Sequence, residues 1–241
     1  MRPGEHGYDP LRQAQLVLSR VARPLRRNPG NWQETPLDRF DDEGRERFYA
    51  RGAEQIATLT ERIKAQTGFE LEGRRALDFG CGAGRTALAL AERCEHVYGL
   101  DASPNALREA DRNAKRLNLD NVEWMEPGGL ADLGGRYDLV ISFFVFQHIP
   151  SREGERIFET LVRGLRPGGA GALQVTLRPL VRGPARQLLY MNTNAYSLNR
   201  LGRLLADASV TEWHVMLHAR PGDPNSRRRS YEDATIIFRK D

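Results

Sequence analysis

A short run of glycines between two carboxylates is the first place in the chain where the residue types suggest chemistry. Asp78 lies in an apolar run, and Gly80, Gly82 and Gly84 follow it before a helical stretch begins. Glycines at alternate positions let the backbone pass close to a ligand, and the free N–H groups of a helix start face the same place. Asp101 ends a second apolar run. Two strands that end in carboxylates, with a glycine turn between them, predict a nucleoside site whose second carboxylate binds ribose hydroxyls.

The glycine turn fits two classes of cofactor. Residues 82–87 match the GxGxx(G/A) pattern of dinucleotide sites, which alone is a weak signal. Asp78 argues against a dinucleotide, because a carboxylate just before the first glycine would repel a pyrophosphate. The same carboxylate suits a cationic amino group, directly or through water, and S-adenosylmethionine carries such a group and no phosphate. The pattern therefore favours S-adenosylmethionine over a nicotinamide or flavin, with a ligand-free strand–helix turn as the plain alternative.

Composition and charge place the chain among cytoplasmic globular proteins. Its 241 residues suffice for one large domain or a domain with an appendage. No apolar run approaches the ~18 residues of a membrane span, and the N-terminus lacks the apolar core of a signal peptide. The two cysteines have neither disulfide nor metal spacing. The net charge is +4 and the arginines are scattered among acids, which favours a solvated surface over a nucleic-acid patch.

Strands and helices are expected to alternate along most of the chain. A basic amphipathic helix is predicted over 11–25 and a second helix over 46–67. Beyond residue 74, strands are expected at 76–79, 97–100, 121–125, 137–145, 172–177, 210–217 and 234–238, with helices at 85–94, 103–117, 151–166 and 199–208 and none between the last two strands. Those two must be antiparallel, because no crossover helix fits between them. The predicted fold is α/β, a doubly wound, seven-stranded, mostly parallel sheet with one antiparallel edge strand. Residues 1–70 would form an N-terminal helical cap or lid, and residues 71–241 the cofactor-binding core.

Four segments in order resemble one family. LDFGCGAGR (77–85) resembles the first motif of class I S-adenosylmethionine-dependent methyltransferases, of the bacterial small-molecule type, and VYGLDAS (97–103) resembles their second. YDLVISFFVFQHIP (137–150) resembles the fourth-strand motif, and LRPGG (165–169) the turn before the fifth strand. The resemblance implies a Rossmann-like core, S-adenosylmethionine as methyl donor and S-adenosylhomocysteine as product.

The resemblance also implies roles for individual residues. Gly80 and Gly82 would approach the methionine end of the cofactor. Asp101 would bind the ribose, Ala102 would flank the adenine, and Phe143 would lie beside the cofactor.

On the adenine side, the sequence departs from the family. An acid that faces the adenine amine is expected after the third strand, and Gly128 stands in its place. We therefore expect backbone groups of Gly129 and Leu130 to serve instead.

His148 is the candidate catalytic base. It follows the fourth strand at the carboxyl edge, where ligands bind in such sheets, and its ordinary pKa near 6.5 suits proton removal at neutral pH. A structural histidine that bonds a neighbouring loop is the alternative. Some relatives carry acids beside this histidine and bind a metal, but Phe146 and Gln147 stand here, so no metal ligand set is predicted.

The acceptor is predicted to be a hydroxyl of a small molecule, such as a sugar, a glycan or a secondary metabolite. Candidate acceptor-binding residues are Trp32, Tyr49, Arg178 and Tyr190, from segments that flank the core. An N-methyltransferase or a nucleic-acid methyltransferase is the alternative, although no loop for flipped bases is present. A nicotinamide-dependent reductase and a non-catalytic binding module are remote alternatives, and a homodimer is left open.

Overall fold

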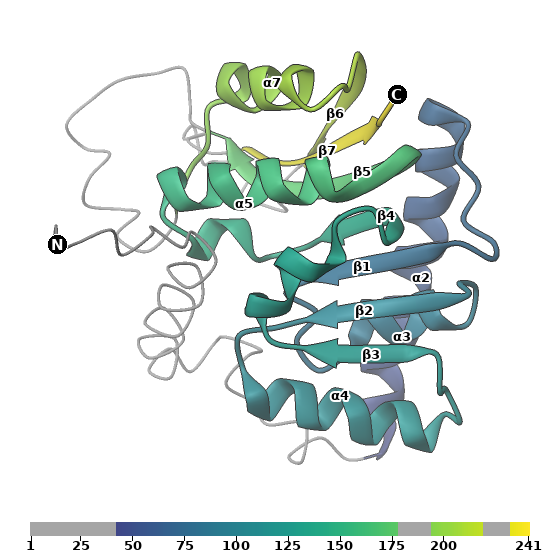
Figure 1. Cartoon of the computed structure of the whole chain (residues 1–241). Coiled ribbons are helices and arrows are strands. Elements are labelled where there is room, and N and C mark those ends of the chain that lie inside the picture. The colour runs from purple at the N-terminus through teal and green to yellow at the C-terminus, as the bar shows by residue number, and fades with distance from the viewer. Residues whose placement is uncertain (1–41, 178–193, 219–231) are drawn as a thin grey trace, which may run out of the picture.

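A single seven-stranded sheet organises the chain. The computed structural model describes residues 42–177, 194–218 and 232–241. The strand order is β3-β2-β1-β4-β5-β7-β6, as Figure 1 shows. The strands are β1 (Arg75–Phe79), β2 (His96–Leu100), β3 (Val122–Met125), β4 (Tyr137–Ser142), β5 (Leu165–Leu177), β6 (Glu212–His218) and β7 (Glu232–Arg239). The α-helices are α2 (Asp42–Thr67), α3 (Arg85–Ala91), α4 (Pro104–Arg116), α5 (Ser151–Gly164) and α7 (Leu198–Asp207), with short 3₁₀ helices η2 (Pro127–Leu133) and η3 (Phe146–His148).

The predicted fold class is confirmed, and the structure places the reversed strand within it. Strands β1 to β5 pair in parallel, whereas β7 is antiparallel to both β5 and β6. The reversed strand therefore lies between β5 and the edge strand β6. The short connection between β6 and β7 accounts for their antiparallel pairing, because no crossover helix fits within it.

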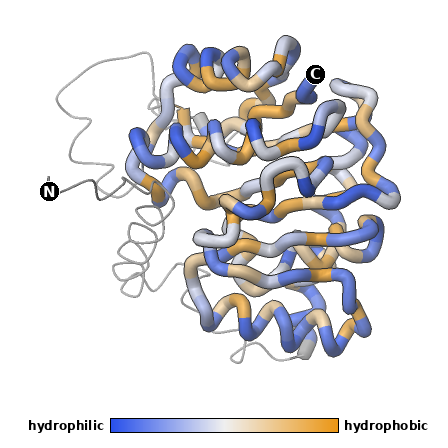
Figure 2. The backbone as a smooth tube through the Cα atoms, viewed as in Figure 1, coloured by the Kyte–Doolittle hydropathy of each residue, from blue (hydrophilic) through white to orange (hydrophobic). Residues whose placement is uncertain are grey.

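Two apolar layers cover the sheet. One core cluster lies between the sheet and helices α5 and α7, and a second joins the other face to α2 and α3. All six residues of β4 are buried, as expected for a parallel strand covered on both faces. In Figure 2 the tube alternates between apolar and polar residues along α4 and α5, which is the pattern of helices with one buried face.

Several boundaries differ from the sequence prediction, and one short helix was not predicted. Strand β4 ends at Ser142 instead of residue 145, because Phe144 has φ +60° and breaks the extended backbone. Strand β5 begins at Leu165, so the expected turn at 167–169 lies inside the strand. The pairing register with β4 shifts there, between Tyr137 and Leu139, and Gly168 at φ +77° accommodates the irregularity. Residues 127–133 form the 3₁₀ helix η2, which periodicity did not predict.

Helix α2 packs directly over the start of α3. A Cβ at Gly52 would lie 2.1 Å from the Arg85 carbonyl oxygen, so only glycine permits this approach. The Arg85 guanidinium lies 5.9 Å from the centre of the Phe48 ring, and the Tyr49 hydroxyl donates a hydrogen bond of 3.3 Å to the Ala83 carbonyl. The first half of α2 therefore rests on the glycine turn that precedes α3.

We predict that Gly52→Ala destabilises the protein despite the better helix propensity of alanine. Alanine gains about 1 kcal/mol over glycine within a helix, but the methyl group would force α2 away from α3. We expect a net loss of about 1–3 kcal/mol, measured by urea unfolding. Ala53→Gly, at an exposed position next in the helix, is the control and should cost only the propensity difference of about 1 kcal/mol. An unfolding midpoint for Gly52→Ala at or above that of the wild type would contradict the packing argument.

Candidate active site

The glycine turn folds back over the end of the neighbouring strand. The N–H groups of Gly80 and Cys81 both donate to the Leu100 carbonyl oxygen, at 2.7 and 3.0 Å. Gly80, Gly82 and Gly84 have φ values of +80°, +55° and +89°, a region that side chains disfavour. The sequence prediction of a tight glycine turn between β1 and α3 is met, and each of the three glycines is required by its backbone conformation.

Asp101 joins this turn to the next helix. Its Oδ2 accepts a hydrogen bond of 2.8 Å from the Gly82 N–H, and its Oδ1 accepts one of 2.8 Å from the Ser103 N–H. Ser103 in turn caps α4 by accepting from the Ala106 N–H. Removal from water raises the pKa of the Asp101 carboxyl, and the two N–H donors act in the opposite direction. A carboxylate has about four lone-pair sites, so each oxygen can still accept a second hydrogen bond from a ribose hydroxyl.

Asp78 is buried behind the turn. Only 1% of the residue is exposed, and its Oδ2 accepts a hydrogen bond of 2.6 Å from the Thr86 hydroxyl. Burial raises the pKa of the Asp78 carboxyl to about 7, while the Thr86 hydrogen bond and the Arg85 guanidinium act to lower it. Thr86 was not predicted, although its place two residues after the last glycine is a signal in the sequence. The contact of Asp78 with a cofactor amino group stays a prediction.

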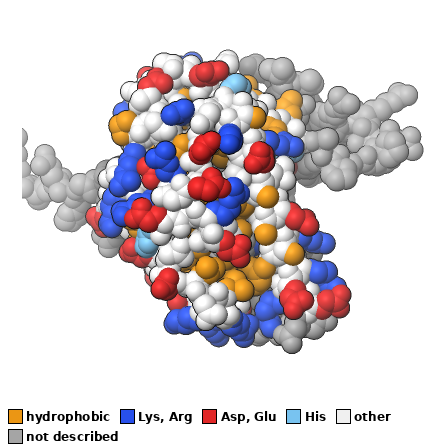
Figure 3. All heavy atoms as spheres, turned by 90° about the vertical axis from the view of Figure 1, so that its right-hand side faces the viewer, with side chains coloured by type: hydrophobic (Ala, Val, Ile, Leu, Met, Phe, Trp, Pro, Cys, Tyr) orange, Lys and Arg blue, Asp and Glu red, His pale blue; other side chains and the backbone are white. Residues whose placement is uncertain are grey.

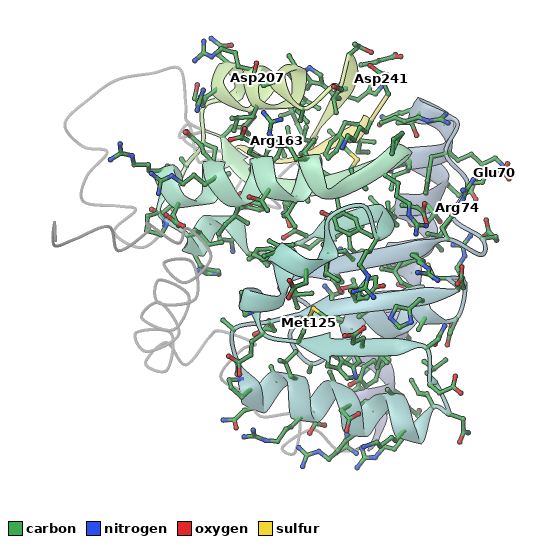
Figure 4. All side chains as sticks on the ribbon, in the orientation of Figure 1. Glu70, Arg74, Met125, Arg163, Asp207 and Asp241 are labelled. Atoms are coloured by element: carbon green, nitrogen blue, oxygen red, sulfur yellow. The ribbon has the colours of Figure 1, made fainter. Side chains whose placement is uncertain are left out.

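The segment after β3 borders the turn on the adenine side of the predicted site. Met125, labelled in Figure 4, ends β3, and its carbonyl oxygen accepts a hydrogen bond of 3.2 Å from the Asp101 N–H. In η2 the Gly129 N–H donates to the Glu126 carbonyl at 2.9 Å, and the Leu130 side chain is buried. The Gly129 N–H is therefore already used within η2, so the predicted adenine contacts of this segment would have to come from its other backbone groups. Ala102 is half-buried beside Asp101.

The segment after β4 carries the other predicted residues. Phe143 is half-buried and packs against the core cluster on the α2 side of the sheet. His148 ends η3, is half-buried, and has its Nε2 3.4 Å from the Gln147 amide nitrogen. Removal from water lowers the pKa of His148, so its ring is neutral at pH 7. A neutral ring at the carboxyl edge of the sheet is in the right protonation state to accept a proton.

Residues distant in sequence hold η3 in place. The Tyr196 hydroxyl, which is fully buried, lies 2.8 Å from the carbonyl oxygens of both Phe146 and Ile149. The Asn194 N–H donates to the Gln147 carbonyl at 2.8 Å. Tyr196 and Asn194 were not predicted, because their roles depend on tertiary contacts and on no local pattern.

The candidate acceptor residues are only partly covered by the structure. Tyr49 binds the Ala83 carbonyl, so the structure brings it to the glycine turn. Trp32, Arg178 and Tyr190 lie outside the described residues, as does the helix predicted over 11–25. Within residues 42–177, 194–218 and 232–241, no group of three or more His, Cys, Asp and Glu side chains is arranged to hold a metal ion. In the same part of the chain, no helix is long and apolar enough to cross a membrane.

A hollow of about 620 Å³ opens at the amino ends of the strands, on the opposite edge of the sheet from these residues. It is lined by Gln66, Thr67, Gly168, Thr211, Glu212, Arg239, Lys240 and Asp241. Figure 3 views the molecule from this side and shows acidic and basic side chains interspersed. Two of the basic groups in the hollow bind backbone, since Arg239 donates to the Thr67 carbonyl and Lys240 to the Arg163 and Leu165 carbonyls. We assign no ligand to this hollow.

The known proteins that the chain resembles include methyltransferases. Residues 76–169 match a family described as "Methyltransferase domain". The chain is 30% identical over 154 residues to a ubiquinone biosynthesis O-methyltransferase of Leptothrix cholodnii, which covers 63% of each protein. It is 35% identical over 94 residues to a 2-heptyl-1-hydroxyquinolin-4(1H)-one methyltransferase of Mycobacteroides abscessus, which covers 38% of this chain and 41% of that protein. The matches therefore span less than two thirds of either relative.

A solved structure shares the fold. Magnesium protoporphyrin IX methyltransferase from Synechocystis, with bound S-adenosylhomocysteine, superposes with a TM-score of 0.62 at 18% identity, over 97% of this chain and 100% of that one. The sheet, the glycine turn and the carboxylate after β2 define an α/β protein built for a nucleoside-containing cofactor. Residues 76–169 thus match a methyltransferase domain, and the fold of the chain is that of a solved S-adenosylmethionine-dependent methyltransferase.

We predict that Asp78 makes the stability of the ligand-free protein fall as pH rises. Its folded pKa of about 7 lies above the unfolded value of 3.8, so the folded state binds the extra proton between these values. Its contribution to stability is therefore complete below pH 3.8 and is lost as pH rises through 7. Relative to Asp78→Asn, the wild type should lose about 2–3 kcal/mol between pH 5 and pH 8, measured by urea unfolding. Parallel stability curves for the two proteins over this range would show that the carboxyl is ionised throughout.

Proposed function

We propose that this protein transfers a methyl group from S-adenosylmethionine to a hydroxyl oxygen of a small molecule. The observation that carries the cofactor assignment is the Asp101 carboxylate, which two backbone N–H groups hold at the mouth of the glycine turn. The left-handed backbone of Gly82, whose N–H binds Asp101, adds a position without a Cβ atom beside it. These residues fit a nucleoside with a neighbouring amino-acid moiety. Members of this family use S-adenosylmethionine, which supplies an electrophilic methyl group on a sulfonium centre.

The residues of the chain divide the work between binding and proton transfer. Asp101 accepts hydrogen bonds from the ribose hydroxyls, and the backbone at Gly80 and Gly82 lies along the methionine end. Ala102 and Phe143 flank the adenine and the reacting centre. Asp78, behind the turn, gains stabilisation of its charged form from a cationic amino group, directly or through a water molecule. Together these contacts fix the orientation on which an in-line transfer depends.

His148 is proposed as the general base. As the new oxygen–carbon bond forms and the carbon–sulfur bond breaks, the hydroxyl proton passes to the neutral imidazole. Support comes from its place at the end of η3, from its neutral state at pH 7, and from the carbonyl contacts of Tyr196 that fix η3. The printed names of two relatives, one an O-methyltransferase and one acting on a hydroxyquinolone, also favour an oxygen acceptor. An amine acceptor, which attacks through its own lone pair and needs no base, is the alternative.

The division into a cap and a core is part of the same proposal. Residues 1–70 would cover the cofactor site of residues 71–241, with Trp32, Tyr49, Arg178 and Tyr190 near the acceptor. The contact of Tyr49 with the Ala83 carbonyl supports this arrangement, since it joins the cap segment to the glycine turn. Calorimetric titration of the protein with S-adenosylhomocysteine and with NAD tests the cofactor assignment, because only the first should bind.

Asp101→Ala should weaken binding of S-adenosylhomocysteine by about 10- to 150-fold, the equivalent of 1.5–3 kcal/mol for lost hydrogen bonds to a charged group. Isothermal titration calorimetry gives the dissociation constant, and urea unfolding run alongside separates lost contacts from lost folding. Asp111→Ala, an exposed acid on α4 that pairs with Lys115, should leave the affinity unchanged. An Asp101→Ala protein that folds and binds with wild-type affinity would refute the ribose assignment.

His148→Ala should lower the turnover number by about 10²–10⁴-fold while cofactor affinity stays close to wild type. The assay screens hydroxyl-bearing small molecules as acceptors and measures the S-adenosylhomocysteine that is released. Because the folded pKa of His148 lies below 6.5, the wild-type rate should fall only at more acidic pH, where the ring becomes protonated. Full activity in His148→Ala, with a flat pH profile, would remove the base and favour an acceptor that needs none.

A further inference from the structure

Phe144 holds a backbone conformation that the other elements do not explain. Of the described residues, three other than glycine have positive φ: Asn118, Phe144 and Ser209. Asn118 and Ser209 each close a helix, where a left-handed residue satisfies the last carbonyl groups: the Leu119 N–H donates to the Ala114 carbonyl and the Val210 N–H to the Leu205 carbonyl. Phe144, at φ +60°, instead follows a strand, and a bulky aromatic residue in this region is a genuine outlier.

A buried side chain from the adjacent strand holds this conformation. The Gln174 Oε1 accepts a hydrogen bond of 3.0 Å from the Phe144 N–H. Gln174 lies inside β5 and is only 6% exposed, on a sheet face that is apolar towards the middle of the strand. A buried polar group needs a partner, and here the partner is the backbone of the strained residue.

The neighbours of Phe144 are packed, whereas Phe144 itself is partly exposed. A Cβ at Gly80 would lie 2.1 Å from a methyl carbon of Val145, so the Val145 side chain fills the space that the glycine leaves. Phe143 packs against the core. The Phe144 residue is 38% exposed, in the segment that joins the carboxyl end of β4 to η3. Backbone strain that exposes an aromatic ring beside a cofactor turn is the kind of feature that function maintains.

We propose that Phe144 is an acceptor-binding residue whose ring forms a platform for a planar aromatic acceptor, and that Gln174 is the positioning residue that holds it. This inference rests on the proposed function and narrows the acceptor from any small hydroxyl compound to an aromatic one. An aromatic acceptor can stack on the ring or meet it edge to face, and either contact adds affinity beyond the buried area. It would orient the reacting hydroxyl between the cofactor turn and His148.

The test uses the full chain, saturated with S-adenosylhomocysteine, and 2-heptyl-1-hydroxyquinolin-4(1H)-one as the planar probe. Isothermal titration calorimetry measures binding of the quinolone, and urea unfolding measures stability. Phe144→Gly should weaken quinolone binding at least tenfold while raising the unfolding midpoint, because glycine relieves the strain. Phe144→Tyr keeps the ring and should bind within about threefold of wild type. S-adenosylhomocysteine affinity should stay within about threefold in both variants.

Two further variants separate the platform from backbone strain alone. Ser209→Gly relieves the same backbone conformation at the end of α7 and should raise the midpoint without changing quinolone binding. Gln174→Met removes the acceptor for the Phe144 N–H and should weaken quinolone binding. Gln174→Glu keeps an acceptor oxygen at this position and should bind the quinolone as the wild type does.

The outcomes for the inference and for the proposed function are distinct. A wild-type protein that binds S-adenosylhomocysteine but binds the quinolone no better than Phe144→Gly, including no binding at all, overturns the inference and leaves the proposed function in place. Equal quinolone affinity in Gln174→Met and wild type overturns the role of Gln174. A wild-type protein that does not bind S-adenosylhomocysteine overturns the proposed function itself.

Discussion

The site depends on one carboxylate that holds two loops together. Asp101 accepts one hydrogen bond from a backbone N–H of the glycine turn after β1 and another from the N–H of the residue that caps α4. Hydrogen bonds to an ionised acceptor are among the stronger ones in proteins, and these two are short and come from backbone that cannot rotate away. The carboxylate is thereby fixed before any ligand arrives, with its remaining lone pairs directed by the loops that it joins. The position of Asp101 in turn follows from the pairing of β1 with β2, which brings Phe79 opposite Leu100 and sets both strand ends at the same edge.

Much of this arrangement is local in sequence and could be predicted. Alternating apolar runs and helical stretches gave the order of strands and helices, and the parallel sheet follows from that order. The glycine turn and the carboxylate of Asp101 could be predicted because the residue types and their spacing indicate them directly. The reversal of β7 was also predicted, since the connection from β6 is too short for a crossover. Its place between β5 and β6 was not, because the order of neighbours depends on packing of the whole sheet.

The features that escaped prediction depend on contacts between distant residues. Gln174 binds the backbone of Phe144 across two adjacent strands, and Tyr196 supports η3 from beyond a long connection. No periodicity marks either residue. The end of β4 was placed three residues too late because Phe143, Phe144 and Val145 are as apolar as the strand before them, and hydropathy carries no information about φ. The 3₁₀ helix η2 was missed for a related reason, since proline and glycine at its start are equally typical of an irregular loop.

The contact between Val145 and the position of the missing Cβ at Gly80 has a consequence for how two ligands act on each other. The turn proposed to bind the cofactor and the segment proposed to bind the acceptor share a van der Waals surface, with no side chain of the turn between them. A displacement of either segment must be transmitted to the other. If cofactor binding orders the turn, it therefore also changes the order of the acceptor segment. Thermodynamic reciprocity requires the acceptor to change the affinity for the cofactor by the same factor by which the cofactor changes the affinity for the acceptor. Binding of the cofactor to one loop and of the acceptor to the other is thus thermodynamically linked, because Gly80 has no Cβ atom to hold the two loops apart.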